Sequence, residues 1–335
     1  MNENFSAGII GIGSYLPEKR MTNADLEKMV ETTNDWIIER TGIRERRVAP
    51  ENEATSDLAA RAGKKAIEDA GLDPLDIDMV ITATITPDMF FPSTACFVQA
   101  KLGLKNAGAF DLLAACSGFG YALKIADGLV RSGSSRRVLV IGAETLTKII
   151  DWQDRGTCIL FGDGAGAAVI GRVKEGAGLI GNYAGADGNQ TEILYLPGGG
   201  SRFPASMESI DNRLHYIKMN GKETFKCAVK TMSDAALKVL ADAGKELSDV
   251  DLLIPHQANM RIISAVGKKL DIPMEKIYVT VDKYGNISAA TTIIALDEAY
   301  REGRIKNGDL VMLVAFGGGL TWSANLIKWN KEELK

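Results

Sequence analysis

The feature that most constrains the fold of this chain is one pattern that returns at a fixed separation of 173 residues. Four pairs of segments share this separation: 69–71 with 242–244 (both Asp-Ala-Gly), 77–81 with 250–254, 122–126 with 295–299, and 138–143 with 311–316. Agreement of four segments in one register indicates two copies of one α/β unit and excludes the shorter solenoid repeats. We therefore predict two similar halves, 1–176 and 177–335.

Composition narrows the class of protein. With 46% apolar and 24% charged residues in a chain of 335, this is a globular protein long enough for two domains. A formal charge of −4 gives no reason to expect nucleic acid. The four cysteines are far apart and only two histidines occur, so no metal site is predicted. No signal peptide and no apolar run of ~20 residues is present, so we expect a cytoplasmic protein without a membrane partner.

Cys116 is a candidate nucleophile. Residues 109–115 form a short apolar run that is typical of a buried strand, and apolar residues recur at helical spacing over 122–130, which places Cys116 on a strand-to-helix turn. The free N–H groups that begin the helix favour an anion, which predicts a lowered thiol pKa and a usable thiolate. The alternative is an inert buried cysteine, the commonest role of a cytosolic cysteine.

The repeat helps to find further polar candidates, because a difference between equivalent positions is not required by the shared fold. Cys116 corresponds to Ala289, and His256 corresponds to Ala83. This asymmetry indicates one active site between the two halves. His256 follows an apolar strand, and the carboxyl ends of strands form the ligand crevice of open α/β sheets. The other histidine, His215, is interpreted as structural.

Three further motifs are candidates for the site, and two of them leave two interpretations. Asn286 precedes a helix, where it either caps the turn or, if Ser288 provides the cap, donates its amide elsewhere. Glycines 317–319 after a strand allow backbone N–H groups to face an oxyanion. Trp36 lies among arginines at 40, 44, 46 and 47, which fits either a solvated helix end or a site for a phosphorylated adenine ligand.

Together, Cys116, His256 in Pro-His-Gln-Ala-Asn, Asn286 in Gly-Asn-Ile-Ser-Ala-Ala and the terminal Phe-Gly-Gly-Gly resemble the β-ketoacyl-acyl carrier protein synthase III family. The resemblance extends from Gly8 to Trp329. It implies the thiolase fold, an internally duplicated α/β architecture of five layers in the order α-β-α-β-α, and a homodimer. It also implies the initiating condensation of fatty acid biosynthesis, in which an acyl-coenzyme A primer reacts with malonyl-acyl carrier protein. The expected primer is acetyl-coenzyme A. The coenzyme A thioester is a substrate, and no cofactor is expected.

The resemblance also implies roles for individual residues. Cys116 would take the acyl group, the N–H groups of Cys116 and Gly318 would hold the oxyanion, and His256 with Asn286 would bind the malonyl thioester oxygen. The substrate and coenzyme A contacts would be Thr32, Trp36, Arg40, Arg155, Gly221, Asn259, Arg261 and Phe316. Phe91 would close the acyl pocket of a partner subunit. The carrier protein would dock on Lys226, Arg261, Lys268 and Lys269.

Related enzymes provide the alternatives. Elongating synthases use Cys-His-His, thiolases need a second cysteine in the terminal glycine loop, and hydroxymethylglutaryl-coenzyme A synthases use a glutamate base that the sequence does not place. A carrier-independent polyketide or secondary-metabolite synthase shares Cys-His-Asn and is the first alternative. A Cys-His thioesterase that hydrolyses acyl-coenzyme A, and a binding protein without catalysis, are the others.

Overall fold

The computed structural model describes residues 4–334, so the ends of the two predicted halves, residues 1–3 and 335, lie outside the described residues. Its core contains two sheets. The first has the strand order β1 (Phe5–Tyr15), β7 (Asp163–Lys174), β6 (Val138–Thr145), β4 (Met79–Ala83) and β5 (Gly108–Leu112). The second has the order β11 (Leu252–Pro255), β12 (Leu310–Gly317), β13 (Thr321–Lys328) and β8 (Gly178–Ala186). The chain thus leaves the first sheet at Lys174 and enters the second at Gly178.

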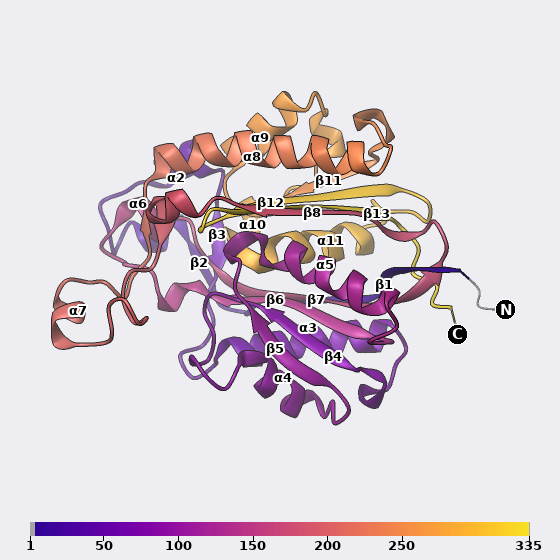
Figure 1. The fold of residues 1–335 in the computed structure, drawn as a ribbon. Coiled ribbons are helices and arrows are strands. Elements are labelled where there is room, and N and C mark those ends of the chain that lie inside the picture. Colours follow the sequence, from indigo (N-terminus) through magenta and orange to yellow (C-terminus); the bar gives the residue numbers. More distant parts are fainter. Residues whose placement is uncertain (1–3, 335) are drawn as a thin grey trace.

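Helices cover both sheets and separate them, which gives five layers in the order α-β-α-β-α (Figure 1). The outer helices are α3 (Thr55–Asp69) and α4 (Thr94–Leu102) on the first sheet, and α8 (Gly221–Asp242) and α9 (Met260–Lys269) on the second. The middle layer is formed by α5 (Gly118–Arg131) and α11 (Thr291–Arg301). The predicted five-layer α/β fold is therefore confirmed.

The middle helices are apolar because strands lie on two sides of them. Phe119 and Leu123 of α5 and Ile293 of α11 belong to one core cluster that includes strands of both sheets. Glycine permits the close approach on one side: a Cβ on Gly142 of β6 would lie 2.5 Å from the Ala289 carbonyl oxygen. Both helices are held in place by burial on two sides. Their N-termini lie beside the cavity described below.

The duplication is visible in the elements themselves. β1 and β8 begin 173 residues apart, at Phe5 and Gly178, and β4 and β11 begin at Met79 and Leu252 with the same separation. Each half also has a parallel strand pair followed by antiparallel neighbours. The halves differ at β5, because the residues equivalent to it form the short helix α10 (Val281–Tyr284). The second sheet therefore has one strand fewer.

The prediction of a buried strand before Cys116 is only partly right. The strand covers 108–112, and it lies at the edge of the first sheet with Phe110 partly exposed. One side of β5 has no neighbouring strand among residues 4–334, so this edge of the sheet is open.

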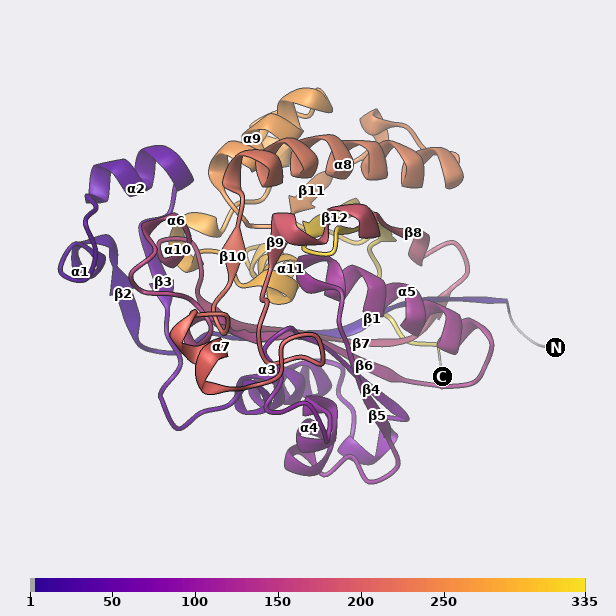
Figure 2. The ribbon, with the colours of Figure 1, turned by 60° about the vertical axis from the view of Figure 1, so that its left-hand side comes forward.

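Shorter elements form a lobe beside the layers (Figure 2) and a segment that projects from them (Figure 1). The lobe contains β2 (Arg20–Thr22), α1 (Asn23–Leu26), α2 (Asn34–Thr41), β3 (Glu45–Arg47) and α6 (Arg155–Cys158). The segment contains β9 (Leu194–Tyr195), α7 (Met207–Asp211) and β10 (Lys218–Met219). No helix among residues 4–334 combines the length and apolar character required to cross a bilayer.

Candidate active site

Cys116 lies in the 3₁₀ turn η2 (Ala115–Ser117), which passes directly into α5. The predicted strand-to-helix turn is confirmed. Ala115 has a left-handed backbone with φ of 46°. The equivalent residue of the second half, Ser288 in the turn η7 (Ser288–Ala290), has φ of 43°. Because both halves adopt this conformation and only one has a cysteine, the strained turn is a property of the fold.

The expected lowering of the Cys116 thiol pKa is wrong. The side chain is only 5% exposed, and burial raises the pKa of the Cys116 thiol to about 12. Removal of water disfavours the thiolate more than the nearby N–H groups favour it. The resting side chain is therefore a thiol, and it must lose its proton during the reaction.

His256 follows β11, and its own N–H donates to the Val314 carbonyl oxygen at 2.7 Å, which fixes the residue at the end of the sheet. Burial lowers the pKa of His256 to about 3, so the imidazole is neutral at neutral pH. Its Nδ1 lies 2.6 Å from Thr291 Oγ1. The single Thr291 hydroxyl proton has two acceptors in reach, His256 Nδ1 and the Ser288 carbonyl oxygen at 3.0 Å. If it is donated to Nδ1, the ring proton is on Nε2, which becomes a donor; if it is donated to Ser288, Nδ1 carries the ring proton and Nε2 has a free lone pair.

Asn286 is held by backbone and side-chain contacts. Its N–H donates to the Leu160 carbonyl oxygen at 2.8 Å, and its own carbonyl accepts from the Gly162 N–H at 3.0 Å. Its Oδ1 accepts from the Ser288 N–H at 2.8 Å. Asn286 is therefore itself the residue that caps the turn, contrary to the suggestion that Ser288 provides the cap. The side-chain Nδ2 remains available as a donor.

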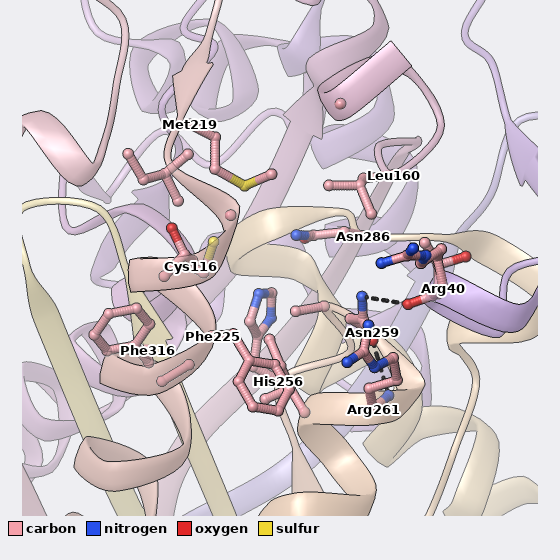
Figure 3. Close-up of a pocket in the computed structure, with 18 of the residues that line it drawn as sticks. Arg40, Cys116, Leu160, Met219, Phe225, His256, Asn259, Arg261, Asn286 and Phe316 are labelled. Atoms are coloured by element: carbon pink, nitrogen blue, oxygen red, sulfur yellow. Dashed lines mark hydrogen bonds between the residues drawn. The ribbon is translucent and has the colours of Figure 1, made fainter. Parts of the chain in front are cut away.

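These three residues line one cavity of about 570 Å³ together with Phe316, which lies near the end of β12. Figure 3 shows the Cys116 sulfur, the His256 ring and the nitrogen end of Asn286 directed toward the same space. Cys116 comes from the first half, while His256 and Asn286 come from the second. The arrangement places a thiol near a neutral imidazole and a carboxamide, and all three side chains are buried.

The far end of the cavity is bordered by a different set of side chains. Residues from α2, α8 and the start of α9 line it: Trp36, Arg40, Gly221, Asn259 and Arg261. Asn259 Nδ2 donates to the Arg40 carbonyl oxygen at 3.1 Å, which joins α2 to α9. The guanidinium of Arg155 lies 4.8 Å from the centre of the Trp36 ring. An aromatic ring with arginines around it suits a phosphorylated adenine group.

Several predicted residues do not line this cavity. Thr32 and Arg155 lie outside it, although Arg155 contacts the ring of Trp36. Gly318 also lies outside its lining, but a Cβ on the preceding Gly317 would lie 2.6 Å from the Cys116 nitrogen, so the glycine loop is packed against the turn of Cys116. Lys268 and Lys269 end α9 away from the lining, whereas Lys226 borders it. Phe91 is 85% exposed.

Two residues next to Cys116 were missed by the reasoning from sequence. They are Ser288 and the fully buried Glu144, and both change the pKa of the Cys116 thiol. The repeat contained the signal that could have found them. Ser288 is equivalent to Ala115, and Glu144 is equivalent to Gly317. Each is thus a polar residue that the other half replaces with a small apolar one, as for Cys116 and His256.

Comparison with protein families finds two matching models. Residues 110–188 match the family described as 3-oxoacyl-[acyl-carrier-protein (ACP)] synthase III, and residues 240–329 match its C-terminal part. The first match contains Cys116, and the second contains His256 and Asn286. The two matched regions therefore carry all three residues that meet in the cavity.

Individual relatives match along nearly the whole chain. A β-ketoacyl-[acyl-carrier-protein] synthase III of Caldanaerobacter subterraneus is 60% identical over 99% of this chain and 100% of its own length. One from Clostridioides difficile is 55% identical over 97% of this chain and 99% of its own. The crystal structure of 3-oxoacyl-[acyl-carrier-protein] synthase III from Aquifex aeolicus superposes with a TM-score of 0.90 at 48% identity, over 97% of this chain and 100% of that one.

Proposed function

The chain belongs to the β-ketoacyl-acyl carrier protein synthase III family, the initiating condensing enzymes of fatty acid biosynthesis, and we propose that Cys116, His256 and Asn286 perform its reaction. The observation that carries this proposal is their meeting, from both halves, in one cavity with a tryptophan and arginines at its far end. In the first step Cys116 attacks the thioester carbonyl of an acyl-coenzyme A primer, with acetyl-coenzyme A as the proposed primer. Coenzyme A leaves, and an acyl-cysteine remains.

The proposed oxyanion hole is formed by the N–H groups of Cys116 and Gly318. The packing of the glycine loop against the Cys116 nitrogen supports this assignment. Each such donor stabilises the transition state by ~3 kcal/mol in comparable sites. Phe316 is proposed to border the reacting groups, since its side chain lines the cavity beside them.

His256 and Asn286 are proposed to act in the second step, when malonyl-acyl carrier protein has replaced coenzyme A. His256 Nε2 and Asn286 Nδ2 donate to the malonyl thioester oxygen, so that loss of carbon dioxide produces a stabilised enolate. The neutral state of His256 supports this role, because its low pKa keeps the imidazole uncharged. The enolate attacks the acyl-cysteine, and 3-oxoacyl-acyl carrier protein is released.

The far end of the cavity is proposed to hold coenzyme A, through Trp36, Arg40, Gly221, Asn259 and Arg261, with Thr32 and Arg155 outside its lining. Arg155 is proposed to act by stacking on Trp36. No cofactor is proposed, since the coenzyme A thioester is a substrate. The division of the chain into halves 1–176 and 177–335 is also proposed, as is a cytoplasmic location of the protein.

Two partners are proposed beyond acyl-coenzyme A. A second copy of the chain would cover Phe90, Phe91 and Leu113, which are 80%, 85% and 79% exposed near the open edge of β5. Such an apolar patch supports a homodimer in which Phe91 enters the partner's acyl pocket. The acyl carrier protein is proposed to dock on α8 and α9, through Lys226, Arg261, Lys268 and Lys269. Arg261 to Lys269 spans ~12 Å along α9, which suits a protein-sized acidic partner.

Sequential addition of substrates tests the proposed function. Incubation with acetyl-coenzyme A is expected to leave an acetyl group on Cys116, identified by mass spectrometry of the peptide. Later addition of malonyl-acyl carrier protein should discharge it and form 3-oxobutyryl-acyl carrier protein. Discharge by malonyl-coenzyme A instead favours the carrier-independent synthase, and release of free acetate favours the thioesterase. Absence of an adduct with acyl primers of several sizes contradicts the proposal.

The hydroxyl of Thr291 is expected to set the tautomer of His256. Thr291 Oγ1 lies 2.6 Å from His256 Nδ1 and 3.0 Å from the Ser288 carbonyl oxygen, and its one proton can be donated to either acceptor. The proposed role of Nε2 as a donor requires that this proton be donated to Nδ1. In Thr291→Val, which keeps the shape but removes the donor to Nδ1, the Nε2 atom loses its defined role as donor. Decarboxylation of malonyl-acyl carrier protein is expected to fall ~10- to 100-fold. Acetyl transfer should be nearly unchanged, and Thr291→Ser should retain the wild-type rate; an equal fall in both steps contradicts this role.

A further inference from the structure

A buried amide in the loop after β11 has no role in the steps above. Gln257 is 1% exposed, and its side chain is not part of the lining of the cavity. Its Nε2 donates to the Pro255 carbonyl oxygen at 2.7 Å and to the Tyr278 carbonyl oxygen at 3.1 Å. Its Oε1 accepts from the N–H groups of Thr280 at 2.8 Å and Val281 at 3.2 Å. The amide thus uses both of its donors and both lone pairs of its oxygen.

The nitrogen of this amide completes a strand pairing that a proline interrupts. One edge of β11 runs alongside residues 277–278, where the Tyr278 N–H donates to the Leu253 carbonyl oxygen at 3.0 Å. In a parallel pair the next bond would run from the N–H of residue 255 to the Tyr278 carbonyl oxygen, but Pro255 has no N–H. Gln257 Nε2 takes that place and also bonds the Pro255 carbonyl oxygen. The side chain therefore joins the end of β11 to the segment beside it.

The oxygen of the same amide holds the start of α10. The first N–H groups of a helix have no partner within it, and the side chain of Thr280, which precedes α10, provides no cap. Gln257 Oε1 accepts from the Thr280 and Val281 N–H groups instead. α10 is four residues long, and Asn286 follows it after one glycine. One side chain thus holds both the strand that leads to His256 and the helix that leads to Asn286.

The internal repeat shows how the first half is built without this connection. Thr84 is equivalent to Gln257, and its backbone N–H donates to the Leu112 carbonyl oxygen at 3.2 Å, so strand pairing continues there through the backbone. Leu113, the equivalent of Asn286, follows that strand and is 79% exposed. In the second half α10 replaces the strand, and Asn286 is 6% exposed in the lining of the cavity. The amide of Gln257 lies where the chain departs from the strand and brings a carboxamide to the site.

The second step needs two donors that meet one oxygen. His256 and Asn286 lie on separate segments, so both reach that oxygen only when the separation of the segments is fixed. A misplacement of about 1 Å can lower the rate of a reaction by ~100-fold. The backbone of Leu160 and Gly162 holds Asn286 from the side of the first half. We propose that Gln257 is a positioning residue that sets the separation of His256 and Asn286 for decarboxylation. This inference rests on the proposed function, which assigns both residues to one oxygen.

Two substitutions remove donors from this amide. In Gln257→Glu the oxygens can still accept from α10, but a carboxyl group has at most one proton to donate, so at least one of the two carbonyl groups loses its donor. Gln257→Met has a similar length and donates nothing. The kcat for decarboxylation of malonyl-acyl carrier protein is expected to fall ~10-fold in Gln257→Glu and ~100-fold in Gln257→Met. KM should change little, because the proposed docking surface on α8 and α9 is unaltered. Acetyl transfer to Cys116 should remain within a few-fold of the wild-type rate.

A double-mutant cycle separates positioning from a general loss of stability. In His256→Ala only one of the two donors remains, so there is no separation to set, and adding Gln257→Glu should cost less than it does in the wild type. A residue that only stabilises the fold would cost the same in both backgrounds. The matched control is Gln99→Glu. Gln99 Nε2 donates to the Leu104 carbonyl oxygen at 2.8 Å away from the cavity lining, and its substitution should leave the ratio of the two half-reactions unchanged.

The outcomes separate this proposal from the proposed function. Both half-reactions are measured on one sample, so their ratio does not depend on the fraction of folded protein, and a less stable variant still gives a result. A fall of decarboxylation alone, and a smaller one in His256→Ala, supports the positioning role. Unaltered decarboxylation, an equal fall of both half-reactions, or a loss of the same size in His256→Ala overturns it. Wild-type protein that does not decarboxylate malonyl-acyl carrier protein overturns the proposed function instead.

Discussion

Cys116→Ala is expected to eliminate acyl transfer while the rest of the site continues to work. Without the sulfur no thioester forms, and condensation should fall by more than ~10⁴-fold, as for removal of other enzyme nucleophiles. The substitution should leave the fold intact, because Ala289 occupies the equivalent turn of the second half. Intact-protein mass spectrometry after mixing with acetyl-coenzyme A measures the adduct directly.

The matched control for this variant is Cys158→Ala. Cys158 is also a buried free cysteine, but it does not line the cavity. This variant should still accept one acetyl group, whereas Cys116→Ala should accept none. Malonyl-acyl carrier protein should still lose carbon dioxide on Cys116→Ala, since His256 and Asn286 are unchanged. An adduct that persists in Cys116→Ala would assign the nucleophile to another residue.

The fold could be predicted from the sequence because its repeat is long and in register. A separation of 173 residues appears in the sequence at Asp69 and Asp242, and in the structure these residues end α3 and α8. The position of Cys116 on a turn was equally readable, since a strand pattern changes there to a helical one. Both properties depend on the order of apolar and polar residues along the chain, and the hydrophobic periodicity of the sequence shows that order directly.

The properties that could not be predicted depend on packing between distant segments. The pKa of the Cys116 thiol is raised because residues of both halves exclude water from it, and no local pattern shows that burial. The role of Asn286 as a cap depends on its own contact with the Ser288 N–H, and its position depends on Leu160 and Gly162, more than a hundred residues away. The placement of Ser288 and Glu144 near Cys116 likewise exists only after the two sheets have packed.

The two halves explain how a nearly symmetric fold can have one asymmetric site. In each half, a turn begins a middle helix and strands end near the centre of the molecule. Four pairs of equivalent positions lie in these turns and strand ends. The first half has Cys116 and Glu144 at these positions, and the second has His256 and Ser288. The opposite copies are Ala289, Gly317, Ala83 and Ala115. Small residues there leave the space in which the polar side chains of the other half meet.

His256→Ala is expected to separate the two half-reactions in the direction opposite to Cys116→Ala. The imidazole is proposed to donate to the enolate oxygen, so decarboxylation should fall ~10²- to 10³-fold. Acetyl transfer to Cys116 should remain within a few-fold of the wild-type rate. Alanine is accommodated at the equivalent residue Ala83, and His215→Ala, which changes an exposed histidine, is the control that should alter neither step.

Asn286→Ala extends this prediction to a double-mutant cycle. If His256 and Asn286 donate to the same oxygen, their effects depend on each other. Each single variant then already loses part of the joint stabilisation, so the double variant should lose less than the product of the two single losses. Release of carbon dioxide from labelled malonyl-acyl carrier protein measures all four proteins. Independent, multiplicative losses would indicate two separate roles, and a loss confined to acyl transfer would remove both residues from the decarboxylation step.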